Sequence, residues 1–246
     1  MKLIKLDAID STNDFLKSIS GQDELENFTV VTAENQTKGK GQMGAKWQSE
    51  SGKNLIMSIL VRDFVFDNEQ VFNLSLIIAL SVIDVLKSLD ISDLSIKWPN
   101  DIMSYNKKIG GILIENTIKS DGRIVSVVGL GLNVNQTNFA ELPYASSLAV
   151  ISGRNFDKDS LPQLIVEKIK ERIDLWETKS AIFWDEYFNS LFRKGVPMPF
   201  KNLTPKALGQ NFMGIIRGVS SVGKIQILLE DDSVAEFDIK EIQMLY

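Results

Sequence analysis

The sequence contains no cysteine and no histidine among its 246 residues. These absences exclude disulfide bonds, thiolate nucleophiles, imidazole bases and zinc sites built from Cys and His. Any chemistry must therefore come from lysine, arginine, carboxylate, hydroxyl or backbone amide groups, or from an ion bound through oxygen. The chain also lacks an uninterrupted run of about 18 apolar residues, and its N-terminus, MKLIKLDAID, lacks the apolar stretch of a signal peptide. We therefore expect a cytoplasmic protein with no membrane segment.

The composition is that of a globular chain, with 44% hydrophobic and 24% charged residues. Its length allows one large core and a small second domain. The net charge of −5 argues against general nucleic-acid binding. The sign reverses between residues 37 and 53, where Lys38, Lys40, Lys46 and Lys53 face only Glu50. A positive, glycine-rich loop on an acidic protein indicates an anion site, and the plain alternative is a solvated surface loop.

The spacing of Gly39, Gly41 and Gly44 in this loop matches the G-x-G-x-x-G motif of dinucleotide-binding proteins. That motif requires a strand leading directly into the first glycine and a helix beginning at the last one. Here the polar segment 34–38 separates the apolar run FTVVTA from Gly39, and no helical apolar period follows Gly44. A P-loop is excluded because Ala45 stands where lysine is required. The glycines therefore predict a long, flexible polar loop and disfavour a nicotinamide-dependent oxidoreductase.

Apolar periodicity and turn residues predict the remaining elements. Helices are expected at 11–19, 71–89 and, as one or two pieces, within 160–192. Strands are expected at 2–9, 28–33, 54–63, 94–98, 108–119 and 123–135. Segment 193–202, with two prolines, is predicted to be a linker, followed by short strands at 213–219, 224–230 and 233–239 with a turn at 230–232. About 50 residues of short strands are typical of a small barrel-like domain.

A β-hairpin gives the most specific geometric prediction. Asp121-Gly122 is a favoured two-residue turn, and it pairs Gly110 with Asn133. The long side chain of Lys108 then lies within reach of Asn133, beside a patch of backbone without side chains. Taken alone, a lysine such as Lys108 is more often a surface residue than a catalytic one. Considered as a pair, these two polar groups indicate a functional site.

Four stretches in this order resemble the biotin protein ligases: STN at 11–13, GKGQMGAKW at 39–47, KWPNDI at 97–102 followed by KKIGGILIE, and GLGLNVN at 129–135. The resemblance extends from about residue 1 to the C-terminus. It implies an α+β fold in which helices flank a mixed, largely antiparallel sheet like that of class II aminoacyl-tRNA synthetases and biotin synthetases. It also implies a catalytic domain at 1–194 and a small SH3-like β-barrel at 195–246.

The resemblance implies a short-form biotin–[acetyl-CoA-carboxylase] ligase. Such an enzyme forms biotinyl-5′-AMP from biotin and ATP with Mg²⁺, then transfers biotin to a lysine of a biotin carboxyl carrier protein. The family pattern begins by residue 10, which leaves no room for an N-terminal DNA-binding winged helix, so no DNA partner is expected. The alternatives are a lipoate–protein ligase of the same fold, although such ligases usually carry a histidine motif, and a nucleotide-dependent regulator without turnover. The sequence does not determine whether the protein forms a homodimer through an exposed sheet edge.

The resemblance also assigns the site. Lys108 is the expected catalytic cation between the biotin carboxylate and the α-phosphate, and Asp101 is expected to orient or deprotonate the acceptor lysine. The expected biotin-binding residues are Ser11, Thr12, Gln36, Gly39, Lys40, Lys108 and Gly111. The expected nucleotide-binding residues are Lys40, Gln42, Trp47, Asn100, Lys108 and Asn133, with Mg²⁺ held mainly by the phosphates. The sequence departs from the family where Lys40, Gln42 and Ala45 replace loop arginines, and Gln42 lacks the charge and bidentate contact of a guanidinium. Ser11-Thr12 is equally a helix cap, and Asn100-Asp101 equally turn chemistry.

Overall fold

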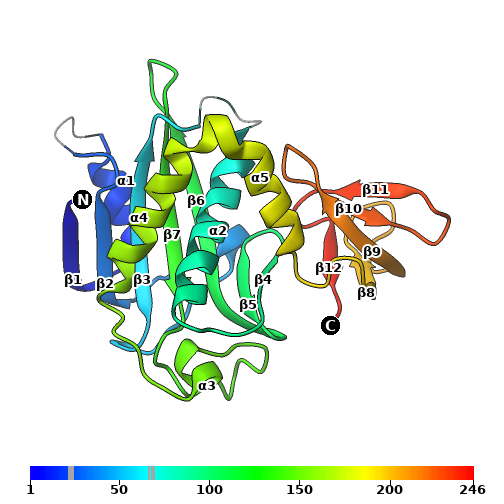
Figure 1. The fold of residues 1–246 in the computed structure, drawn as a ribbon, viewed down its shortest axis with the longest axis horizontal. Helices are drawn as coiled ribbons and strands as arrows, with labels where there is room; N and C mark the ends of the chain where they lie inside the picture. The colour runs from blue at the N-terminus through cyan, green and yellow to red at the C-terminus, as the bar shows by residue number, and fades with distance from the viewer. Residues whose placement is uncertain (22–24, 66, 68–69) are drawn as a thin grey trace.

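The computed structural model describes residues 1–21, 25–65, 67 and 70–246. Within them, a seven-stranded sheet has the order β1-β2-β3-β7-β6-β5-β4 (Figure 1). The strands are β1 Leu3–Ile9, β2 Val30–Gln36, β3 Leu55–Arg62, β4 Leu94–Lys97, β5 Asp101–Ser104, β6 Lys107–Ile118 and β7 Ile124–Leu132. β1 and β2 are parallel, whereas the other neighbouring pairs of this sheet are antiparallel. The predicted α+β class with a mixed, largely antiparallel sheet is therefore confirmed.

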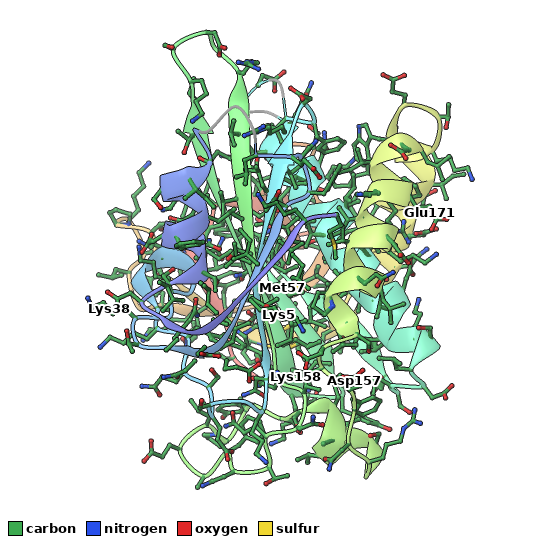
Figure 2. The ribbon with its side chains drawn as sticks, turned by 90° about the vertical axis from the view of Figure 1, so that its left-hand side faces the viewer. Lys5, Lys38, Met57, Asp157, Lys158 and Glu171 are labelled. Atoms are coloured by element: carbon green, nitrogen blue, oxygen red, sulfur yellow. The ribbon has the colours of Figure 1, made fainter. Side chains whose placement is uncertain are left out.

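Helices cover both faces of this sheet. Figure 2 shows the sheet nearly edge-on, with α1 on the side of Lys38 and α4 on the side of Glu171. The helices are α1 Thr12–Ile19, α2 Val71–Ser88, α3 Leu148–Ser152, α4 Leu161–Asp174 and α5 Trp176–Asn189. Of the one or two helices predicted within 160–192, the structure has two, with Leu175 at the junction.

Strand β3 divides its side chains between two cores because successive side chains point to opposite faces. Met57 and Ile59 belong to the large core that includes α2 and α4. Leu60 packs with Leu16 of α1 in a smaller core on the other face. Ser58 lies on this second face and is completely buried. A buried hydroxyl therefore interrupts an otherwise apolar strand beneath α1.

Helix α2 is the apolar centre of the fold, as the sequence predicts for 71–89. Its mean hydropathy of 1.8 over 18 residues would suit a membrane span by length and composition alone. However, 67% of it is buried inside the fold, where it packs against α4, α5 and β4. The structure therefore accounts for its apolarity as that of a core helix.

A second, five-stranded antiparallel sheet follows α5, in the order β11-β10-β9-β8-β12. Its strands are β8 Pro197–Asn202, β9 Asn211–Val219, β10 Ile225–Leu228, β11 Val234–Phe237 and β12 Ile242–Met244. The prediction that 193–202 is a linker is wrong for Pro197–Asn202. In this strand Met198 and Phe200 face the core, while the two prolines alternate with them on the exposed side. Strand β12 pairs only with residues 200–202, so the prolines precede that ladder.

The two sheets are joined by a buried hydrogen bond from the indole of Trp98 to the backbone of the small sheet. Trp98 Nε1 donates to the carbonyl oxygen of Gly223 at 2.9 Å. Gly223 has a φ of +90°, and a Cβ at this position would lie 2.4 Å from Phe72 of α2. The turn between β9 and β10 is therefore packed directly against the large sheet and α2.

The predicted hairpin forms, but its register differs by one residue. The backbone N–H of Lys119 donates to the carbonyl oxygen of Arg123, so three residues, not two, form the loop. Gly122 occupies the left-handed region at φ +84°, as in hairpins whose third loop residue forms a glycine bulge. Gly110 consequently pairs with Leu132 instead of Asn133. The predicted convergence of Lys108 and Asn133 rested on the wrong register.

Strand β2 is longer than predicted, because its parallel partner β1 pairs with the polar residues Asn35 and Gln36. The predicted polar gap before the glycine loop is thus shortened to Thr37 and Lys38. Since β1 and β2 are parallel, their carboxyl ends lie at one edge of the sheet. Gln36 therefore ends beside the start of α1, where Ser11 caps the helix by accepting a hydrogen bond from the backbone N–H of Asp14.

Candidate functional site

A pocket of about 270 Å³ lies on the α1 face of the large sheet. The first turn of α1 and the end of β2 form one wall, strands β3, β6 and β7 form the floor, and the glycine loop covers the opening. Its lining residues are Ser11, Thr12, Asn13, Gln36, Lys40, Gly41, Gln42, Met43, Ala45, Lys46, Trp47, Ile56, Met57, Asn100, Asp101, Lys108, Gly111, Ile112, Leu113, Gly129, Leu130 and Gly131.

Glycines in adjacent strands hollow out the floor. Gly131 of β7 lies between Ile56 of β3 and Gly111 of β6, all on one face. A Cβ on Gly131 would lie 2.4 Å from the indole of Trp47, closer than real contacts allow. The bare backbone of Gly131 therefore provides the surface against which this indole packs. Gly129 has the equivalent role for Asn13, whose Oδ1 would lie 2.5 Å from an added Cβ.

The glycine loop is folded as a small hairpin over the pocket. Trp47 N–H donates to the carbonyl oxygen of Gly39 at 3.0 Å, and Gly41 N–H donates to that of Ala45 at 2.7 Å. A Cβ on Gly39 would lie 2.4 Å from the carbonyl oxygen of Trp47, so the two backbone segments approach too closely for a side chain. Met43 completes the tip with a left-handed φ of 60°. The glycines thus allow the loop to fold into a hairpin that places Trp47 in the pocket.

Lys40 fastens this hairpin to α1. Its Nζ lies 2.6 Å from Oδ2 and 2.8 Å from Oδ1 of Asp14. Hydrogen bonding to Lys40 lowers the pKa of the Asp14 carboxyl, with a further contribution from Lys17. Lys17 also pairs with Glu115 of β6 at 2.6 Å. The loop cation is therefore held by a charge network that extends from α1 to the sheet.

Lys108 places a second cation at the other end of the pocket. Its Nζ lies 2.6 Å from Oδ1 of Asp101, and Lys97 Nζ lies 3.8 Å from Oδ2 of the same carboxylate. Lys108 Nζ also lies 5.8 Å from the ring centroid of Trp47. The backbone of Lys108 is fixed by hydrogen bonds to Tyr144 and Ser146. A positioned ammonium, a carboxylate and an aromatic face therefore meet within one pocket.

A larger chamber of about 710 Å³ opens from the same point. Trp98, Pro99, residues 142–145 and, from the small-sheet segment, residues 239–240 and 242–246 line it, and most of this lining is apolar or aromatic. Gln42, Asp101 and Lys108 line both cavities. Lys108 and Asp101 are thus placed where two bound molecules, one in each cavity, would meet.

Hydrogen bonds organise the inner end of the smaller pocket. Gln36 Oε1 accepts from the backbone N–H of Thr12 at 2.7 Å and from its hydroxyl at 3.0 Å. The hydroxyl of Thr12 also lies 2.8 Å from that of Ser58. Pocket residues at this end are polar and neutral, whereas the other end carries Lys108 and Asp101. Such an arrangement suits an elongated ligand with a polar, uncharged head and an anionic tail.

Most residues predicted for the site line this pocket. They are Ser11, Thr12, Gln36, Lys40, Gln42, Trp47, Asn100, Asp101, Lys108 and Gly111. Gly39 lies at the base of the loop and outside the lining. Asn133, 6% exposed, is also outside it, and its Nδ2 donates to the carbonyl oxygen of Ser146 at 2.9 Å. Among the described residues, no group of three or more acidic side chains forms a metal site.

The sequence interpretation missed Asn13, Ser58 and the seats provided by Gly129 and Gly131. Asn13 stands within the STN stretch, so its place in the first turn of a helix was a usable signal. Ser58 also left a signal, because a single hydroxyl interrupts the apolar run LIMSILV. Which strand lies beneath α1 is a tertiary fact that periodicity does not encode.

Comparison with known proteins gives consistent results. The Biotin/lipoate A/B protein ligase family matches residues 6–135, which make up more than half of the chain. The Bifunctional ligase/repressor BirA of Escherichia coli is 29% identical over 235 residues, covering 93% of this chain and 69% of that protein. The Biotin–[acetyl-CoA-carboxylase] ligase of Mycobacterium tuberculosis is 27% identical over 223 residues, covering 87% of this chain and 79% of that protein.

A solved structure extends the similarity over the whole chain. The biotin protein ligase from Aquifex aeolicus in complex with biotin and ATP superimposes with a TM-score of 0.79 at 28% identity. The match covers 99% of this chain and 98% of that one. The similarity therefore includes both sheets.

Proposed function

Because the chain belongs to the Biotin/lipoate A/B protein ligase family, we propose that it is an ATP-dependent biotin–protein ligase. It forms biotinyl-5′-AMP and transfers biotin to a lysine of a carrier protein. The observation that carries this proposal is the position of Lys108, which lines both the small pocket and the larger chamber. A ligand carboxylate from the first cavity and a phosphate from the second both meet this cation.

The small pocket suits biotin. The ureido ring is placed against Thr12 and Gln36, the apolar tail runs along Trp47 and the bare backbone of Gly111, and the carboxylate reaches Lys108. ATP occupies the larger chamber, whose apolar and aromatic walls suit a nucleoside and whose lysines suit its phosphates. Asn100 and Gln42 are proposed to contact the nucleotide, because each lines one or both cavities.

In the first step an oxygen of the biotin carboxylate attacks the α-phosphorus, and pyrophosphate leaves. Both reactants are anionic, so they repel one another until a positive charge is placed between them. The ammonium of Lys108 supplies that charge and holds both groups in position. Its partner Asp101 is released from the ion pair when phosphate takes its place.

In the second step the amine of the acceptor lysine attacks the carbonyl carbon of the mixed anhydride, and AMP leaves. An ordinary lysine has a pKa of about 10.4, so the amine must lose a proton before it attacks. The freed carboxylate of Asp101 lies at the junction of the two cavities and orients the amine or accepts that proton. The folded glycine loop covers the intermediate and excludes water.

The cation and partners follow from the same chemistry. Mg²⁺ would be held mainly by the phosphate oxygens of ATP and would neutralise part of the triphosphate charge. The acceptor is a biotin carboxyl carrier protein or domain, without a DNA or membrane partner. We propose that this ATP-consuming reaction takes place in the cytoplasm. The outer side of β1, at the end of the large sheet, is the proposed contact in a homodimer. We propose residues 1–194 as the catalytic domain and 195–246 as an SH3-like domain.

Replacement of Lys108 by alanine tests the proposal. We expect formation of biotinyl-AMP, measured by mass spectrometry with biotin and Mg-ATP, to slow by roughly 100- to 1,000-fold because a charge stabilising the transition state is lost. Lys107→Ala removes the same charge from the neighbouring position, whose ammonium instead donates to the carbonyl oxygen of Pro143, and should retain activity. Adenylation at the normal rate by Lys108→Ala refutes the mechanism. Formation of lipoyl-AMP but not biotinyl-AMP by the wild-type protein refutes the substrate.

A further inference from the structure

Behind the small pocket, four oxygen atoms form a continuous chain. Gln36 Oε1 lies 3.0 Å from the hydroxyl of Thr12, which lies 2.8 Å from that of Ser58, which lies 2.6 Å from Oδ1 of Asn13. Ser58 is 0% exposed, Thr12 3% and Asn13 4%. The hydrogen atoms of these groups must therefore be distributed among the protein atoms themselves.

The two terminal atoms of this row of oxygens, Gln36 Oε1 and Asn13 Oδ1, can only accept hydrogen bonds. The carboxylate of Glu115 accepts hydrogen bonds only, so the Asn13 atom that faces it at 2.8 Å is Nδ2, and Oδ1 must face Ser58. At the other end the backbone N–H of Thr12 is a donor, so the Gln36 atom that faces it at 2.7 Å is Oε1. Neither amide can rotate by 180° without losing a strong partner. Glu115 is itself held by Lys17.

The number of hydrogen atoms then determines what Thr12 offers to a ligand. Only two hydroxyl hydrogens, those of Thr12 and Ser58, are available for the three oxygen–oxygen contacts. The shortest contact, between Ser58 and Asn13, takes the hydrogen of Ser58. The hydroxyl hydrogen of Thr12 is then directed to Ser58 or to Gln36, and both of these acceptors belong to the row of four oxygens. Toward the pocket, the hydroxyl of Thr12 consequently presents only lone pairs.

Gln36, in contrast, presents a hydrogen-bond donor to the pocket. Its Oε1 is occupied by Thr12, so its Nε2, for which the described residues provide no acceptor, presents a hydrogen-bond donor. The inner end of the pocket therefore places an acceptor beside a donor. This pair complements a planar group in which an N–H adjoins a carbonyl oxygen, as in a cyclic urea.

We propose that Ser58 is a positioning residue that sets this polarity and thereby selects a ureido ring over rings without an N–H donor. The inference rests on the proposed biotin ligase function and adds a residue that does not line the pocket. Without Ser58, only Gln36 Oε1 remains to accept the hydrogen of Thr12, at 3.0 Å and already occupied by a backbone N–H. The hydroxyl of Thr12 is then free to turn its hydrogen toward the pocket.

The test compares Ser58→Ala with Ser126→Ala. Ser126 is 1% exposed and donates to Oδ1 of Asn116 at 2.7 Å in the same sheet, so it resembles Ser58 in burial and bonding, whereas Ser58 bonds to Thr12 and Asn13 instead. For Ser58→Ala we expect the KM for biotin to rise about three- to tenfold, the effect of one neutral hydrogen bond, with kcat and the KM for ATP unchanged. Ser126→Ala should leave all three constants unchanged.

Two carbamate analogues of biotin, each with one ureido N–H replaced by oxygen, test the polarity directly. For wild type, we expect at least one analogue to bind on the order of 100-fold more weakly than biotin, because two acceptors then face each other. In Ser58→Ala this ratio should fall to about tenfold, because the hydroxyl of Thr12 can turn. An unchanged ratio, or a KM for biotin equal to that of Ser126→Ala, overturns the inference.

Failure of the proposed function gives a different result, because wild type would then form no biotinyl-AMP. If Ser58→Ala does not fold, Ser58→Cys retains a side chain of similar length but bonds only weakly through sulfur. It should show the same fall in the ratio between biotin and its carbamate analogue, and an unchanged ratio in this variant also overturns the inference.

Discussion

Gly131→Ala tests the seat of Trp47 without any assumption about function. The three atoms nearest to an added Cβ all belong to the Trp47 indole, at 2.4, 2.5 and 2.9 Å. A methyl group at this position forces the ring out of its seat. Overpacking of this kind typically costs about 1–3 kcal/mol. In the opposite direction, alanine in place of a strand glycine stabilises by about 0.5–1 kcal/mol through the unfolded chain.

These two effects separate in a double-mutant cycle with Trp47→Ala. In the wild-type background both effects act, so we expect Gly131→Ala to lower the free energy of unfolding by up to about 2.5 kcal/mol. In the Trp47→Ala background the clash is absent, so the same change should be neutral or stabilising by about 0.5–1 kcal/mol. The alanine gain is present in both backgrounds, so the coupling between the two positions equals the overpacking cost, about 1–3 kcal/mol. Gly111→Ala, whose nearest contacts at 3.3 Å are to the flexible end of Lys108, should cost less.

The assay is denaturant unfolding of the four proteins of the cycle, followed by circular dichroism. Tryptophan fluorescence of Gly131→Ala should also report a more exposed indole than in wild type. If Gly131→Ala costs the same in both backgrounds, the indole does not occupy this seat and the described pocket geometry is refuted.

Three further predictions follow from individual contacts. Asp101→Asn should slow biotin transfer to a carrier protein by about 100-fold or more, because the group that accepts the proton is lost, while single-turnover adenylation stays within a few-fold of wild type. Asp14→Asn should make amide hydrogen exchange in residues 39–47 about two- to fivefold faster at pH 6, whereas Asp10→Asn, which breaks a pair with Lys38, should not. Since Lys40 lowers the pKa of Asp14, the wild-type pair persists above the ordinary aspartate pKa and is lost as pH falls through the lowered value, where the two proteins should converge. Tyr187→Phe should raise the free energy of unfolding by about 1 kcal/mol, seen as a Tm increase of about 2–4 °C, because the buried hydroxyl has no hydrogen-bond partner in the described part of the chain. Burial raises the pKa of Tyr187, so wild type should lose stability above pH 10 more steeply than this variant, and equal slopes would contradict the assignment.

The sequence was sufficient for elements whose pattern is local. Helix α2 repeats apolar residues at helical spacing and was predicted within one residue of its observed end at Ser88. Ser11 caps α1 as expected, because a cap needs only its own neighbours. The order of the four short motifs predicted the family, and most of the residues that they assign line one pocket.

What the sequence did not determine depends on partners distant in the chain. Pro199 suggested a linker, yet β8 tolerates it because the alternate residues Met198 and Phe200 are buried against other strands. The turn at Asp121-Gly122 has the composition of a two-residue turn, and only the hydrogen bonding of the flanking strands distinguishes it from the observed three-residue loop. The assignment of Asn133 partly followed that register, and its side chain instead supports Ser146.

The glycine loop illustrates the same limit. Its composition predicted flexibility, because glycine and lysine form no core by themselves. The observed hairpin depends on Trp47, which reaches the sheet, and on Asp14, which lies on a different element. Neither contact can be read from spacing within the loop.

The hydrogen bond between Trp98 and Gly223 has a mechanical consequence. Trp98 is separated from Asp101 by only two residues, and it is clamped between the large sheet and a turn of the small one. A displacement of the small sheet is therefore transmitted through Trp98 to the segment that ends at Asp101. The orientation of the C-terminal segment is in this way coupled to the position of Asp101, which lies three residues after Trp98.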